Sequence, residues 1–118
     1  MKDKKIQILG SEYVIKVYNK NSELFDKGCT GFCGFHTKEI ALLNLDTDED
    51  WNSSSEDEKA IVIKQTLRHE VIHAYLYESG LAWCSNNVES WALNEEMVDW
   101  LAIQSPKIFN TFIELDIM

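Results

Sequence analysis

The spacing of hydrophobic and polar positions changes along the chain, and the change predicts strands first and helices afterwards. In residues 6–18, β-branched and aromatic side chains alternate around a break at Gly10, which predicts one or two strands. Residues 19–34 carry three glycines among polar side chains and are predicted to form a loop. A further strand is predicted for residues 35–45, with a turn around 37–39.

A helical period begins after the polar loop predicted for residues 46–55. Ser55 and Glu58 have the spacing of a capping box, in which a side chain satisfies free backbone N–H groups at a helix start. Apolar residues then recur at helical spacing as far as Leu76, and Gly80 is suited to the position just after a helix end. These signals predict one helix of roughly 25 residues.

Two more helices are predicted after a loop at residues 81–87. Residues 88–105 are apolar on nearly every side, which is typical of a helix in the centre of a domain. Ser105 and Pro106 are predicted to end that helix and to begin a short one, with Ser at the N-cap and Pro at the first helical position. The predicted fold class is therefore α+β, with a small antiparallel sheet followed by three helices in a single domain, residues 1–118.

Composition narrows the possible functions. The net charge is −9 and no basic cluster could follow a phosphate backbone, so nucleic-acid binding is not expected. No stretch is long enough to cross a bilayer, and no apolar segment follows the charged N-terminus, so neither a membrane partner nor a secretion signal is expected. Three cysteines, an odd number, are most simply reduced thiols, which predicts a cytoplasmic protein. The oligomeric state is not predicted.

The most informative motif is HExxH, formed by His69, Glu70 and His73 late in the first predicted helix. Two histidines four residues apart lie one turn apart on the same face, so both imidazoles can reach one metal ion. Glu70 is rotated by about 100° from His69 and can take a proton from a water molecule beside the metal. The pattern also occurs by chance in helices, so a site requires a third ligand elsewhere in the chain.

Candidates for the third ligand lie on the helix predicted for residues 88–105, which carries Glu95, Glu96 and Asp99. A buried carboxylate without a partner costs several kcal/mol, so these side chains need a cation or hydrogen bonds. Glu95 and Asp99 share one face. We interpret Glu95 as a metal ligand, with Glu96 as the alternative, and Asp99 as the acceptor for the free ring N–H of a ligand histidine. Pairing with lysine, arginine or solvent is the other interpretation.

Together these residues resemble a gluzincin, the metallopeptidase group in which a glutamate on a later helix completes an HExxH zinc site. Asn94-Glu95 with Asp99 is similar to the thermolysin-type NExxxD signature. The small size is closer to minimal cytoplasmic zincins of phages and prophages, including the ImmA/IrrE-like metallopeptidases, and the match covers residues 56–105. The resemblance implies a zincin-like fold and zinc-dependent hydrolysis of a protein or peptide substrate. It also implies ligand roles for His69, His73 and Glu95, with Glu70 as the base.

Some assignments stay open. Thermolysin-like enzymes stabilise the oxyanion with another histidine or tyrosine, for which Tyr77 and His36 are candidates here. In small zincins an extended substrate can pair with a sheet edge beside the site, and residues 40–45 are the predicted edge. A second metal site at Cys29, Cys33 and His36 is conceivable, although loop or core thiols are the simpler interpretation. The rival to an enzyme is a non-catalytic, zinc-stabilised binding or regulatory module.

Overall fold

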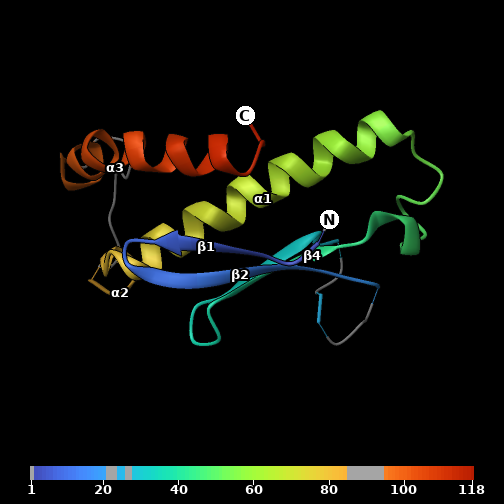
Figure 1. Ribbon diagram of the computed structural model, residues 1–118, viewed down its shortest axis with the longest axis horizontal. Helices are drawn as coiled ribbons and strands as arrows, with labels where there is room; N and C mark the ends of the chain where they lie inside the picture. The colour runs from blue at the N-terminus through green and yellow to red at the C-terminus, as the bar shows by residue number, and fades with distance from the viewer. Residues whose placement is uncertain (1, 21–23, 26–27, 85–94) are drawn as a thin grey trace.

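The computed structural model describes residues 2–20, 24–25, 28–84 and 95–118, apart from the side chains of 83, 84, 95, 98, 99 and 102. These residues form an α+β fold, as predicted, with a four-stranded sheet and two long helices. Figure 1 shows α1 and α3 on the same side of the sheet. The elements in chain order are β1 (Lys4–Ile8), β2 (Ser11–Tyr18), β3 (Gly31–Gly34), β4 (Glu39–Leu43), the 3-10 turn η1 (Leu45–Thr47), α1 (Glu56–Glu78), α2 (Leu81–Cys84) and α3 (Glu95–Glu114).

The sheet is mixed, so the prediction of a purely antiparallel sheet is wrong. Its strand order is β1-β2-β4-β3. A hairpin through Leu9 and Gly10, both with positive φ, joins β1 to β2 and confirms the predicted break. β2 pairs with β4 in parallel, with Ile15 opposite Ile40. The physical reason is β3, which lies in the segment predicted as a loop: it forms an antiparallel pair with β4 and turns β4 into the direction of β2.

The strand predicted for residues 35–45 is shorter in the structure, and it lies inside the sheet and not at its edge. Residues 35–38 form the turn between β3 and β4, and β4 covers only 39–43. Because β4 pairs with β2 on one side and β3 on the other, residues 40–45 are not a free edge, and that prediction is wrong. Among the described strands, the edge on this side of the sheet is β3.

The first predicted helix is confirmed. The Ser55 hydroxyl oxygen accepts a hydrogen bond from the Glu58 backbone N–H at 3.1 Å, and α1 ends at Glu78. Gly80 follows with φ of +81°, a backbone conformation that glycine adopts without strain. The face of α1 that carries Leu67 and Val71 is buried against the sheet.

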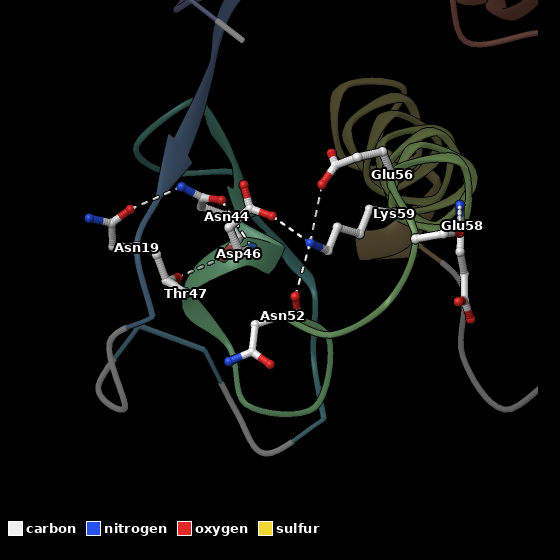
Figure 2. A network of polar contacts seen from close by, with 9 residues as sticks. Asn19, Asn44, Asp46, Thr47, Asn52, Glu56, Glu58 and Lys59 are labelled. Carbon is white, nitrogen blue, oxygen red and sulfur yellow. Dashed lines mark hydrogen bonds and ion pairs between the residues drawn. The ribbon is translucent and has the colours of Figure 1, made fainter.

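Lys59 joins the start of α1 to the loop before it. Its ammonium group donates to a carboxylate oxygen of Asp46 at 2.7 Å, to the backbone oxygen of Asn52 at 3.2 Å and to Glu56 at 3.4 Å (Figure 2). The Asn44 side chain accepts from the Asp46 backbone N–H and begins the short turn η1. The predicted polar loop is therefore an ordered connection in which Asp46 pairs with Lys59 and Asp48 with Lys20.

The C-terminal helices differ from the prediction. Residues 81–84 form the short helix α2 instead of a loop. α3 continues through Pro106, so Ser105 and Pro106 do not begin a separate helix. Proline removes one backbone hydrogen bond, yet the helix persists because Ile108 and Phe112 beyond it are buried in the core. Residues 88–94 lie outside the described part of the chain.

The described part of the second predicted helix is not apolar and buried on every side. Leu101 and Ile103 on α3 are exposed, and the side chains of α3 that are described as buried all lie after Pro106. Among the described residues, no helix combines the length and the apolar character that crossing a bilayer requires.

Candidate metal centre

His69, Glu70 and His73 lie together on α1, as the motif predicts. The Nε2 atoms of the two histidines are 3.0 Å apart, and their rings meet edge to face at an interplanar angle of 74°. One ligand atom from each of the three residues falls within 4.8 Å of the others. In the described part of the chain this is the only group of three or more such side chains that could hold a metal ion.

The cluster borders the start of β3. A cavity of about 400 Å³ lies there, and its wall combines the loop before β3 with one face of α1. The His69 side chain is 69% exposed, whereas that of Glu70 is only 7% exposed. The site is therefore open to solvent at His69 and closed on its inner side by the buried carboxylate of Glu70. The lining residues are Gly28, Cys29, Thr30, Gly31, Gln65, Thr66, His69 and Glu70.

Gly31 allows α1 to approach β3 this closely. A Cβ atom at this position would lie 2.4 Å from Cγ2 of Thr66 and 3.2 Å from Cγ of Glu70. Any larger side chain would therefore separate the helix from the strand. The sequence pattern does not reveal this role, because a glycine inside a predicted loop indicates a turn and gives no sign of a contact with a distant helix.

Burial governs the electrostatics of Glu70 and His73. Burial raises the pKa of the Glu70 carboxyl, and the nearby His69 opposes this rise, with 3.8 Å between Glu70 Oε1 and His69 Nε2. The other carboxylate oxygen, Oε2, is buried and has no hydrogen-bond partner. Burial, with His69 adding to it, lowers the pKa of His73, which favours the neutral imidazole that binds metals.

Tyr77 extends the site by one helical turn. Its ring stacks on that of His73 at a centroid distance of 6.1 Å, and its other neighbour is Phe35 at 4.3 Å. His36 lies against Phe35 in the turn between β3 and β4. The structure thus brings Tyr77 beside the histidine pair, while its role as an oxyanion stabiliser stays a prediction.

The prediction of Glu95 as the third ligand concerns a side chain that the structure does not describe. Glu95 is the first residue of α3 and Asp99 lies one turn further on, but both side chains lie outside the description, so their roles stay predictions. The alternative ligand, Glu96, is exposed.

The position of α3 limits how Glu95 could reach the site. Tyr75 hydrogen-bonds to Thr111 at 2.7 Å, which places the C-terminal half of α3 on the flank of α1 about 160° from His73. The N-terminal half of α3 lies at the end of the molecule where α1 passes into α2 (Figure 1). A glutamate ligand from α3 therefore has to approach around the end of α1.

The cysteines do not form a second centre in the described residues. Cys29 is exposed, whereas Cys33 is buried. Burial, aided by the charges of Glu70 and Glu78, raises the pKa of the Cys33 thiol to about 12, so that it stays protonated at neutral pH. Among the residues that the structure describes, Cys29, Cys33 and His36 are not brought together as a group that could hold a metal ion.

Comparison with protein-family models, curated proteins and solved structures finds no match to this chain. The resemblance to the ImmA/IrrE-like metallopeptidases therefore rests on the sequence motif and stays a prediction.

Proposed function

We propose that this protein is a zinc-dependent peptidase in which His69 and His73 hold the metal and Glu70 acts as the general base. The observation that carries the proposal is the pairing of two Nε2 atoms, 3.0 Å apart, with a carboxylate oxygen of the buried Glu70, Oε1, which lies 3.8 Å from His69 Nε2. Glu95 is the proposed third ligand.

The two histidines fit a zinc ion. Ligand nitrogens about 2.0–2.1 Å from a tetrahedral zinc are roughly 3.3 Å apart, close to the distance between these Nε2 atoms. The same spacing suits a hydrogen bond between the two rings, which satisfies the pair without a metal. The high exposure of His69 favours an open site with room for water and substrate over the closed four-ligand site of a structural zinc.

Glu70 fits the role of a base. A zinc ion at this position would act as a Lewis acid toward water and the substrate carbonyl. Glu70 takes the proton from the attacking water and then passes it to the leaving amine, which requires a carboxyl that both accepts and releases protons near the working pH. Burial raises the pKa of Glu70 in that direction. Its Oε1, which lies 3.8 Å from His69 Nε2, provides the accepting lone pair.

The free edge of β3 is the proposed platform for the peptide. β3 pairs only with β4 among the described residues, and Gly31 at its start contacts the helix that carries Glu70. An extended peptide can add to such an edge through its backbone, which makes binding largely independent of sequence.

Zinc-loaded protein should cleave a pool of fluorogenic peptides, and Glu70→Gln should reduce the rate by about 10²–10⁴-fold while zinc remains bound. Glu58→Gln is the matched control, because Glu58 is an exposed glutamate on the same helix. Full zinc-dependent activity in the Glu70→Gln protein would rule out this mechanism. A non-catalytic zinc module instead predicts no cleavage in any variant and unfolding of His73→Ala.

A further inference from the structure

A second cavity is lined by Tyr77, the residue whose ring stacks on His73. Its volume is about 310 Å³, at the lower end of the range for ligand pockets, ~300–1,000 Å³. Its wall is built by β3 and the turn that follows, with one residue from α1. The lining residues are Phe32, Cys33, Gly34, Phe35, His36, Thr37 and Tyr77.

Tyr77 connects this cavity to the histidine pair. Tyr77 lines the cavity, and its ring stacks on His73 at 6.1 Å. Phe35 packs against Tyr77 at 4.3 Å and also lines the cavity. A side chain seated here would therefore belong to a residue next to, or very near, the bond that is cleaved.

A polar network fixes the turn that forms the cavity wall. Lys38, at the end of the turn, pairs with Glu78 near the end of α1. Glu78 also accepts hydrogen bonds from Tyr13 at 2.8 Å and from Ser11 at 2.9 Å. Because the turn is tied to both α1 and β2, the cavity is formed before any ligand arrives, which lowers the entropy lost on binding.

The chemistry of the wall selects the side chain that can enter. Four of the seven lining residues carry aromatic rings, and none is lysine, arginine, aspartate or glutamate. A charged side chain would lose hydration here and would find no lysine, arginine or carboxylate partner in the wall. A large apolar or aromatic side chain would bury its surface and pair with the rings.

We propose that this cavity is a specificity pocket for a large apolar or aromatic side chain of the peptide, a role that rests on the function proposed above. The chain directions indicate which residue of the peptide it takes. Gly31 lies by Thr66, and Phe35 lies by Tyr77, so β3 and α1 run the same way. A peptide antiparallel to β3, the more stable pairing, has its N-terminal part at the cavity. The pocket therefore takes a residue N-terminal to the cleaved bond.

Binding can be measured apart from cleavage. The probes are capped peptides Ala-Ala-Xaa-Ala-Ala with Phe, Leu, Ala or Glu at Xaa, titrated into the full Glu70→Gln chain and followed by NMR. The Phe and Leu peptides should bind at least tenfold more tightly than the Ala and Glu peptides and should shift the resonances of Tyr77. Phe32→Ala should abolish this preference. Phe109→Ala is the matched control, since Phe32 and Phe109 are 49% and 50% exposed.

Equal binding of the Phe and Glu peptides, or a preference that survives Phe32→Ala, would overturn the pocket. With wild-type protein, cleavage should fall on the C-terminal side of the apolar residue, and cleavage on its N-terminal side would overturn the proposed direction. The two proposals fail separately. Selective binding without any cleavage by zinc-loaded wild type contradicts the peptidase and leaves the pocket, whereas cleavage indifferent to Xaa contradicts only the pocket.

Discussion

Replacing Gly31 with alanine tests the close contact between β3 and α1 on which the site depends. The new Cβ would lie 2.4 Å from Thr66 Cγ2, 3.2 Å from Glu70 Cγ and 3.3 Å from the Ala41 backbone oxygen. Carbon atoms in contact are normally ~3.5–4.0 Å apart, so the helix and strand would have to separate by about 1 Å. Overpacking of this kind costs typically 1–3 kcal/mol.

The expected net effect is smaller than the clash alone. Replacing glycine with alanine restricts the unfolded chain, which contributes about 0.4–1 kcal/mol in the opposite direction. We therefore expect Gly31→Ala to lower the free energy of unfolding by about 1–2 kcal/mol. The assay is urea unfolding followed by tryptophan fluorescence, since the chain has four tryptophans.

A second substitution tests the cause directly. Thr66→Ser removes the methyl group nearest to the new Cβ and keeps the hydroxyl, which shares a 2.6 Å hydrogen bond with Thr30. In the double variant, part of the lost stability should return, by at least ~0.5 kcal/mol in a double-mutant cycle. Gly34→Ala on the same strand is the control, because its nearest contact is the hydroxyl of Thr37 in a turn. Wild-type stability in Gly31→Ala, or no rescue by Thr66→Ser, would refute the reasoning.

Three further predictions concern single residues. Burial opposes ionisation of Glu78, but hydrogen bonds from Lys38 and its other donors outweigh burial and hold the pKa of this carboxyl below its usual value of 4.5. The ionised Glu78 therefore stabilises the fold at pH 7, and Glu78→Gln should be less stable than wild type in urea titrations. This difference should vanish as the pH falls below about 4.5. Glu95→Ala should reduce zinc affinity in a chelator competition, and unchanged affinity would remove Glu95 from the ligand set. If Tyr77 stabilises the oxyanion, Tyr77→Phe should lower kcat by about 10²–10³-fold with zinc retained, and an unchanged kcat would leave the ring only its packing on His73.

The elements with strong local signals were predictable from the sequence. The capping spacing of Ser55 and Glu58 and the glycine at 80 delimit α1 to within a residue or two. The helical register then places His69 and His73 on one face, and in the structure their Nε2 atoms lie 3.0 Å apart. These features depend on residues close in sequence, which is why the pattern suffices.

The features that depend on distant contacts were not predictable. β3 has only four residues, two of them glycine, and it exists because it pairs with β4 and packs against α1. The parallel pairing of β2 with β4 follows from it. Pro106 gave a strong local signal for a helix start, but burial of Ile108 and Phe112 keeps α3 continuous. Tertiary packing overrode the local preference in both cases.

Zinc content is the most direct measure of the central claim, that His69 and His73 share a metal ion. Protein purified without added chelator should contain one zinc per chain by elemental analysis, and His73→Ala should contain almost none while Glu70→Gln keeps it. Circular dichroism of each variant provides the check that the fold is retained. A folded His73→Ala protein with one zinc per chain would contradict the account.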